Sequence, residues 1–209
     1  MSIVQKCSAI LLLSALAQFA HAVPTSLLVN GGFESDLEGW NYTPGTAIRT
    51  LSPLAYEGSN YIFGASVASI HVWQTADLGA SGIDLALVDA GAVLASYGGW
   101  QSGWETQTDS GFTSIDFLDA DSNILGSKSQ DPFFSNSTWV EQSDIAEVLA
   151  GTRFITFHFY GTRDQGSNAD TYLDSAYLEL EASPVPLPAA AWLFGSALLG
   201  LGVVKRRKA

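Results

Sequence analysis

The most regular segment of this sequence is Thr152-Arg153-Phe154-Ile155-Thr156-Phe157-His158-Phe159-Tyr160. Ile155, Phe157 and Phe159 recur at every second position, and polar residues fall between them. Because successive side chains of a strand point to opposite faces, this pattern predicts a β-strand with one face in a core.

Two further segments show the same alternation. Tyr172–Glu181 has one apolar and one polar face, made by Ala176, Leu178 and Leu180 and by Tyr177, Glu179 and Glu181. Ser114–Leu118 predicts a third strand, followed by a turn of small polar residues. Ser143–Leu149 is the one helical candidate and is expected to form a single turn between strands. Short strands separated by turn residues predict an all-β sandwich or barrel.

Both ends of the chain differ from the middle in composition. Met1–Ala22 carries Lys6, an apolar centre and a small-x-small ending, which predicts a secretory signal peptide. The only cysteine is Cys7, so the mature protein has no thiol for a disulfide, a metal or catalysis. Residues 23–183 are predicted to form one domain, and 184–209 hold prolines, an apolar run and four bases, as in a C-terminal transmembrane helix.

The order of parts within this tail is more specific than that of a plain anchor. The proline piece is Val185-Pro186-Leu187-Pro188, and the basic cluster is Lys205-Arg206-Arg207-Lys208. This order resembles the PEP-CTERM sorting signal of Gram-negative bacteria, although no glutamate stands between the prolines here. The resemblance implies a transient stay in the inner membrane with a periplasmic domain, cleavage by an exosortase, and delivery to the cell surface or outside the cell.

The charge of the predicted domain is strongly negative. All 21 acids lie in residues 23–183 together with only Arg49, Lys128, Arg153 and Arg163, which gives a net charge of −17. Such a field repels phosphate backbones and excludes nucleic acid as a partner, whereas it suits solubility and cation binding.

A second resemblance runs through the whole domain. The pieces that carry it are Val29-Asn30-Gly31-Gly32-Phe33-Glu34, Gly39-Trp40, Tyr56-Glu57-Gly58-Ser59-Asn60-Tyr61, Val72-Trp73-Gln74-Thr75, Gly151-Thr152-Arg153 and 166–174. In this order they resemble the galactose-binding-like jelly roll of many carbohydrate-binding modules and secreted surface proteins. The resemblance implies a jelly-roll β-sandwich.

The same resemblance implies a structural calcium ion where the first strand, the following loop and the last strand meet. Matched position by position, its ligands would be Glu34, Glu57, the Asn60 carbonyl and Asp174. Calcium takes six to eight oxygens, and Asp170 is a weaker candidate. The alternative is that Glu34 and Asp174 are solvated or paired with Arg153 or Arg163.

Catalytic arrangements are scarce, so the sequence predicts no enzymatic activity and no catalytic residue. His71 and His158 are isolated, and neither accompanies a Gly-x-Ser-x-Gly motif, so both are interpreted as structural. Asp119 and Asp121 fall within a turn, where aspartate side chains bond to the backbone.

Tryptophan provides the candidate glycan contacts. Trp40 and Trp73 lie in motifs that predict core positions. The segment Tyr97-Gly98-Gly99-Trp100-Gln101-Ser102-Gly103-Trp104 is interpreted as a flexible loop whose glycines leave ring faces uncovered. Tyr97, Trp100 and Trp104 are therefore candidate glycan contacts, and a loop folded over onto the domain is the alternative.

Three functions remain open from the sequence. The first is a non-enzymatic surface or matrix protein, processed by an exosortase and associated with exopolysaccharide or biofilm. The second is a carbohydrate-binding module displayed by the same route. The third is a glycan-acting enzyme.

Overall fold

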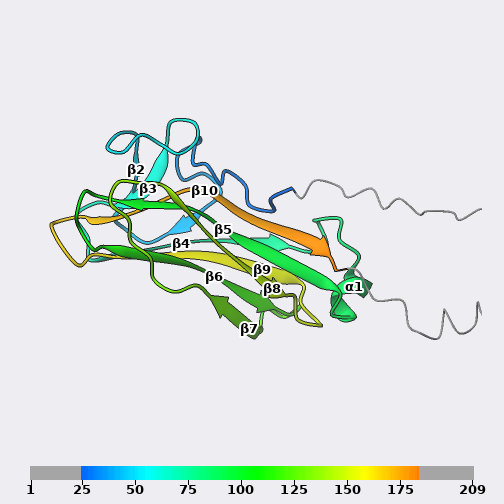
Figure 1. Cartoon of the computed structure of the whole chain (residues 1–209). Helices are drawn as coiled ribbons and strands as arrows, with labels where there is room; N and C mark the ends of the chain where they lie inside the picture. Colours follow the sequence, from blue (N-terminus) through cyan, green and yellow to red (C-terminus); the bar gives the residue numbers. More distant parts are fainter. Residues whose placement is uncertain (1–24, 184–209) are drawn as a thin grey trace, which may run out of the picture.

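Ten strands and one short helix follow one another in residues 25–183, the part of the chain that the computed structural model describes. Sheet A has the order β1-β4-β9-β6-β7, with bounds Asn41–Tyr42, Ser69–Asp77, Phe154–Thr162, Ser110–Leu118 and Ile124–Ser129. Sheet B has the order β2-β3-β10-β5-β8, with bounds Thr46–Arg49, Tyr61–Gly64, Ala169–Ala182, Val93–Gly103 and Val140–Glu147. All pairs are antiparallel, and the two sheets pack face to face (Figure 1).

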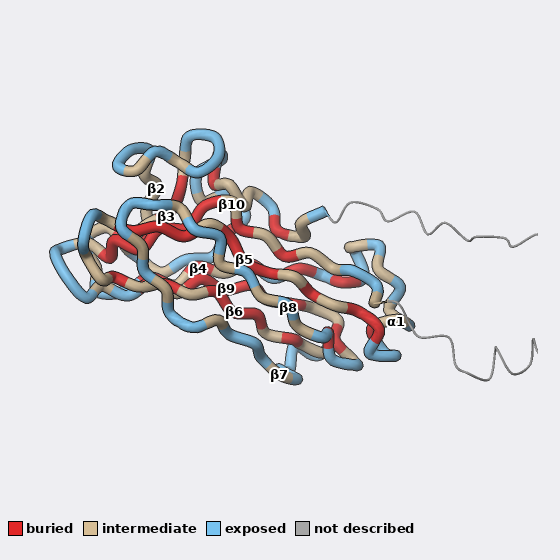
Figure 2. The backbone as a smooth tube through the Cα atoms, viewed as in Figure 1, coloured by how far each residue is buried: buried red, intermediate tan, exposed pale blue. Residues whose placement is uncertain are grey.

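The core lies between the sheets and confirms the predicted alternation. In β9, Ile155, Phe157 and Phe159 have no exposed surface, and in β10 Ala176 and Leu178 are buried opposite them. The buried segments run along the middle strands of both sheets, whereas the loops and the edge strands β7 and β8 are mostly exposed (Figure 2). The prediction of an all-β sandwich of two antiparallel sheets is therefore confirmed. The predicted signal peptide and tail lie outside the described residues.

Two of the sequence predictions about local structure are wrong. Most of Ser143–Leu149 belongs to β8, an edge strand that pairs with β5. Residues 97–103 of the predicted loop 97–104 belong to β5, which pairs with both β8 and β10, and Trp104 directly follows the strand. The helix, α1, is instead Leu85–Asp89, where the Asp84 side chain accepts a hydrogen bond from the Ala86 N–H as N-cap.

The turn after β6 has the predicted role for its aspartates. Oδ1 of Asp119 accepts hydrogen bonds from the backbone N–H groups of Asp121 and Asn123, at 2.9 and 2.8 Å. Asp119 therefore shapes the β6–β7 turn. Within residues 25–183, no helix has the length and apolar character that a bilayer crossing requires.

Candidate functional site

The four predicted calcium ligands come from three segments that the fold brings together. Glu34 follows the Asn-Gly-Gly-Phe opening, Glu57 and Asn60 lie in the loop before β3, and Asp174 lies within β10. Gly31, on the same segment as Glu34, pairs through its carbonyl with the Ala176 N–H at 2.9 Å. The opening segment therefore lies against β10 beside Asp174.

Asp174 is buried and accepts hydrogen bonds only from the backbone. Its Oδ2 receives the N–H groups of Tyr56 at 2.8 Å and Glu57 at 3.1 Å, and its Oδ1 receives the Ser175 N–H at 2.6 Å. Burial raises the pKa of Asp174 to about 6, and the nearby negative charge of Glu34 adds to that rise.

Glu34 binds the other half of the same loop. Its Oε1 accepts the N–H groups of Ser59 and Asn60, both at 2.8 Å. Gly58 has a φ of +66°, which favours glycine, and a Cβ atom there would stand 2.5 Å from this oxygen, so the loop could keep its place only if the Glu34 side chain moved. The loop 56–60 thus directs four backbone N–H groups at two carboxylates, and both carboxylates are fixed in place.

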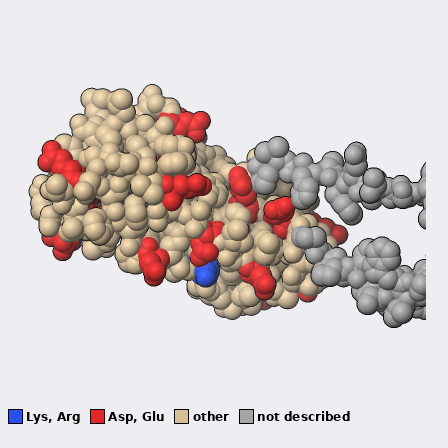
Figure 3. All heavy atoms as spheres, in the orientation of Figure 1, with Lys and Arg blue, Asp and Glu red and all other residues tan. Residues whose placement is uncertain are grey.

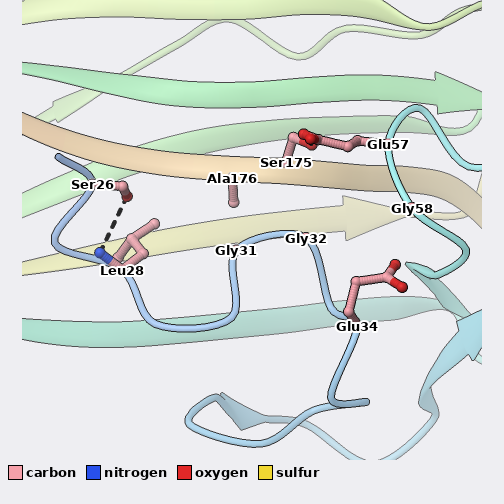
Figure 4. A pocket seen from close by; sticks show the side chains of 9 residues that line it. All are labelled: Ser26, Leu28, Gly31, Gly32, Glu34, Glu57, Gly58, Ser175 and Ala176. Atoms are coloured by element: carbon pink, nitrogen blue, oxygen red, sulfur yellow. Dashed lines mark hydrogen bonds between the residues drawn. The ribbon is translucent and has the colours of Figure 1, made fainter. Parts of the chain in front are cut away.

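A depression of about 470 Å³ opens beside these groups (Figure 4). Glu34 and Glu57 both line it, with Gly58 between them and Ser175 next to Glu57. Oε2 of Glu57 lies 3.3 Å from the Ser175 hydroxyl, and the Asn60 amide donates to the Phe33 carbonyl at 3.0 Å. The structure thus places all four predicted ligands around one loop.

The donor set fits a hard cation in part. Glu34, Glu57 and Asp174 supply carboxylate oxygens, and these are what calcium prefers. Among residues 25–183, no three His, Cys, Asp or Glu side chains converge as a ready-made metal cluster. An ion beside Glu34 and Asp174 would therefore need backbone carbonyls, such as that of Asn60, for much of its coordination.

The basic residues that could have neutralised these acids are engaged elsewhere. Arg153 pairs with Asp89 at 2.9 Å, and Arg163 donates to the Ser167 carbonyl at 2.8 Å. Asp170, the weaker candidate, pairs with Arg49 at 3.1 Å and accepts from the Tyr172 hydroxyl at 2.8 Å. Asp170 is therefore engaged away from the candidate metal site. The alternative is wrong in pairing Glu34 or Asp174 with Arg153 or Arg163, whereas Glu34 is exposed to solvent, as that alternative also allowed.

The predicted glycan contacts, two on β5 and Trp104 directly after it, are largely covered by the protein itself. Tyr97 has no exposed surface and belongs to the core between the sheets. The Trp100 ring stacks on Tyr56 with 3.7 Å between centroids. The Arg49 guanidinium lies 4.7 Å from the centre of the Trp104 ring. Tyr97 is excluded as a surface contact, because its place in a paired strand points the side chain inward. Trp100 and Trp104 keep only part of their surface for a ligand.

A different set of rings lies on the outer face of sheet A. Trp73, His71, Tyr160 and Phe112 follow one another in a stack, here called the ring ridge, with centroid distances of 4.5, 4.3 and 5.1 Å. His71, Tyr160 and Phe112 are direct cross-strand partners on β4, β9 and β6. All four rings are half-buried, so the prediction that Trp73 belongs to the core is wrong, whereas Trp40 is buried as predicted.

A polar chain runs beside the ring ridge. Nε2 of His71 lies 2.9 Å from Nδ1 of His158, and Nε2 of His158 lies 3.3 Å from Oδ2 of Asp116. The His158–Asp116 approach is too bent for a well-formed hydrogen bond, so we describe it as an electrostatic contact. Oδ1 of Asp116 accepts from the Ser127 hydroxyl at 2.6 Å.

Both histidines are neutral near pH 7. Burial lowers the pKa of His71 to about 4, and the neighbouring His158 lowers it further, against the opposing effect of Asp116. Burial also lowers the pKa of His158, although Asp116 opposes that shift. The outer face therefore places aromatic rings, neutral imidazoles and the Asp116 carboxylate side by side.

This face combines the two features that a sugar-binding surface needs, an apolar ridge and adjacent fixed polar atoms. Its signal in the sequence is the spacing of His71 with Trp73 and of His158 with Tyr160, each pair two residues apart on a strand. The two pairs become one surface only through the β4–β9 register, which sequence patterns leave open.

Neither a protein-family model nor a curated protein sequence matches this chain. Its fold is similar to that of solved structures with low sequence identity. The carbohydrate-binding module TmCBM61, solved in complex with β-1,4-galactotriose, is 15% identical with a TM-score of 0.52 over 76% of this chain and 99% of that chain.

Two further structures show the breadth of the fold. A family 16 carbohydrate-binding module is 18% identical, with a TM-score of 0.52 over 73% of this chain and 99% of that one. A cyclase from Fischerella sp. TAU is 11% identical, with a TM-score of 0.54 over 78% of this chain and 100% of that one. These likenesses establish the jelly-roll sandwich and leave the activity open.

Proposed function

We propose that this protein is a carbohydrate-binding domain whose contact surface is the ring ridge on sheet A. The observation that carries the proposal is the in-register row His71, Tyr160 and Phe112, extended by Trp73 and flanked by His158 and Asp116. Ring edges and the outermost ring faces offer dispersion contact to the C–H groups of a pyranose. The polar chain offers partners for its hydroxyl groups. The similar folds of two carbohydrate-binding modules support the proposal that this protein is a carbohydrate-binding domain.

We propose further that the domain is non-catalytic. A general base works best when its pKa lies near the operating pH, and the pKa of His71 is lowered to about 4. The buried carboxyl of Asp174 lies in a different segment, held by backbone N–H groups of the loop 56–60. The fold is shared with a cyclase, so the test of this point is a turnover assay on any glycan that binds.

Calcium belongs to the proposal as a structural ion. Glu34 and Asp174 would hold it, with Glu57 and the Asn60 carbonyl as further ligands. The ion would supply the positive charge that these carboxylates lack, and it would fix the opening segment, the loop 56–60 and β10 to one another.

The glycan proposal predicts a specific loss of binding. Trp73→Ala and Tyr160→Ala are each expected to weaken affinity for the best-binding glycan of an array by roughly 5- to 30-fold, because each removes about 1–2 kcal/mol of apolar contact. Isothermal titration measures the change. Trp100→Ala, on the other sheet, is the comparison variant.

The outcome separates the two surfaces. If Trp73→Ala binds the glycan as tightly as the unaltered protein and Trp100→Ala loses most of its affinity, the binding site lies on β5 and the ring-ridge proposal is rejected. Thermal unfolding of each variant checks that a loss of binding does not reflect a loss of fold.

We also propose that the protein is exported and sorted by an exosortase, and that it acts at the cell surface or in the matrix, with exopolysaccharide as the partner. This part rests on the sequence of residues 1–22 and 184–209. In a host with an exosortase, intact-mass analysis of the secreted protein is expected to show a start near Val23 and no segment after Pro188. Secreted protein that still carries Lys205–Lys208 would contradict sorting and leave a plain membrane anchor.

A further inference from the structure

The side chains of Asp116 and His158 beside the ring ridge favour one of the two tautomers of neutral His71. Nε2 of His158 lies 3.3 Å from Oδ2 of Asp116 without a well-aligned hydrogen bond, and the negative charge of the carboxylate favours the tautomer that carries its proton on Nε2. In a neutral imidazole the other nitrogen, Nδ1, is then an acceptor. Nδ1 of His158 lies 2.9 Å from His71 Nε2, so His71 donates through Nε2.

This order leaves Nδ1 of His71 as an acceptor. Within residues 25–183, Nδ1 of His71 has no hydrogen-bond partner, and the side chain is half-buried between Trp73 and Tyr160. The Ser127 hydroxyl donates to Asp116 at 2.6 Å and holds the carboxylate in place. The ridge therefore presents one acceptor of fixed identity to a ligand.

The charges around this acceptor disfavour an anionic ligand. Strands β4, β9 and β6 contain no Lys or Arg, whereas Asp77 and Asp116 lie on them. The four bases within residues 25–183 are engaged elsewhere: Arg49 with Asp170, Lys128 with Asp144, Arg153 with Asp89, and Arg163 with the Ser167 carbonyl. Figure 3 shows one face of the molecule, on which acidic residues are spread and basic residues are few.

We propose that the ring ridge binds neutral or amine-bearing glycans and rejects polyanionic ones, and that His71 Nδ1 accepts a sugar hydroxyl while Asp116 and His158 hold its tautomer. The inference rests on the proposed glycan function and deepens it. Asp116 and His158 are positioning residues, because they act through His71. A uronate or sulfate on the ligand would meet the Asp116 charge with no cation to offset it.

The tautomer is tested directly by long-range ¹H–¹⁵N spectra of the ¹⁵N-histidine-labelled full chain at pH 7. The expected result is protonated Nε2 and unprotonated Nδ1 for both His71 and His158. In Asp116→Asn the amide N–H₂ can turn toward His158 Nε2, which reverses the order of donors and acceptors from residue 116 to His71. A change of tautomer at both histidines is therefore expected. Asp77→Asn removes the same charge from the same face and is expected to change neither. An Nδ1-protonated His71 in the unaltered protein would overturn the assignment.

Ligand class is tested with named polymers in affinity electrophoresis. A soluble β-1,4-glucan and β-1,4-galactan are the neutral probes, and chitosan is the amine-bearing probe. Alginate and polygalacturonate are the polyanions. Retardation by at least one of the first group is expected at a concentration at least tenfold below that needed with either polyanion. The difference between the two groups in the concentration needed for retardation should become smaller as the salt concentration rises.

Asp116→Asn is expected to weaken the interaction roughly five- to tenfold, the effect of one lost or reversed hydrogen bond, and Asp77→Asn is expected to leave it unchanged. Equal or tighter binding of a polyanion would overturn the inference while leaving glycan binding in place. An absence of binding to every probe would overturn the glycan function itself.

Discussion

Saturating calcium is expected to raise the melting temperature of this protein by about 5–10 °C at pH 7.5. An ion held at 100 times its dissociation constant stabilises the folded state by about 2.7 kcal/mol, and a domain of this size shifts by about 2–4 °C per kcal/mol. Differential scanning fluorimetry with added calcium or chelator measures the shift.

The pH dependence of this shift follows from Asp174. Calcium binds the ionised carboxylate, and the pKa of Asp174 is raised to about 6. Below pH 6 protons compete with the ion, and the apparent affinity for calcium should fall by up to tenfold per pH unit. The calcium-induced shift in melting temperature should therefore shrink. At pH 5 the ion would be at about 10 times its apparent dissociation constant, which leaves about 1.4 kcal/mol, so we expect about half of the shift that is seen at pH 7.5.

The calcium-induced shift reports on the ion better than the melting temperature alone does, because Asp174 and His71 change the stability of the protein with pH in opposite directions. Asp174 has a raised pKa, so the calcium-free protein loses stability as pH rises from about 4 through 6. The pKa of His71 is lowered to about 4, so the protein loses stability as pH falls from about 6.5 toward 4. The difference with and without calcium at each pH removes the His71 contribution.

A second buried aspartate provides the control. Asp109 is 2% exposed and accepts three backbone N–H groups, from Asp164, Gln165 and Asp170. Asp174→Asn and Asp109→Asn should both lower stability, but only Asp174→Asn should remove the calcium response. A response that survives in Asp174→Asn, or none in the unaltered protein, would contradict the calcium proposal.

The strands that could be predicted from sequence are those with one face in the core. In β9 and β10 every second side chain faces the core. Apolar residues therefore recur at every second position of the sequence, as the buried positions do in the structure. Strand β8 is an edge strand with most of its residues exposed, and its alternation is too weak to exclude a helix.

The glycines of strand β5 give its second half the sequence pattern of a loop. A Cβ atom on Gly98 would lie 2.1 Å from the Gln142 carbonyl oxygen on β8, and one on Gly99 would lie 2.8 Å from Leu173 on β10. These glycines allow close packing of neighbouring strands instead of providing flexibility. A sequence pattern does not distinguish the two uses, because the difference lies in the partner strand.

The ring ridge could not be predicted for a related reason. The ring ridge draws its residues from three strands, β4, β9 and β6, and is assembled only by their register. The residues predicted to bind calcium, in contrast, belong to motifs that can be recognised in the sequence, and the binding of calcium stays a prediction. The Asn-Gly-Gly-Phe-Glu opening has a physical basis in the position of Gly31.

Gly31→Ala is expected to lower stability by about 1–3 kcal/mol, the cost of inserting a methyl group into a packed site. The new Cβ atom would stand 2.1 Å from the Ala176 carbonyl oxygen, which is backbone and has no rotamer to escape through. The opening segment and β10 would have to separate, which would strain the hydrogen bond between the Gly31 carbonyl and the Ala176 N–H. Chemical denaturation measures the loss.

Gly32→Ala is the matched control, one residue along the same segment. Its Cβ atom would meet Asp174 Oδ1 at 3.9 Å, an ordinary contact, so its stability should stay the same or rise by about 0.4–1 kcal/mol through a less flexible unfolded chain. Gly31→Ala should in addition weaken the calcium response, because the same separation moves Glu34 away from Asp174. Equal stability of the two variants would show that the opening segment does not lie against β10, and the calcium site would then lose its geometric basis.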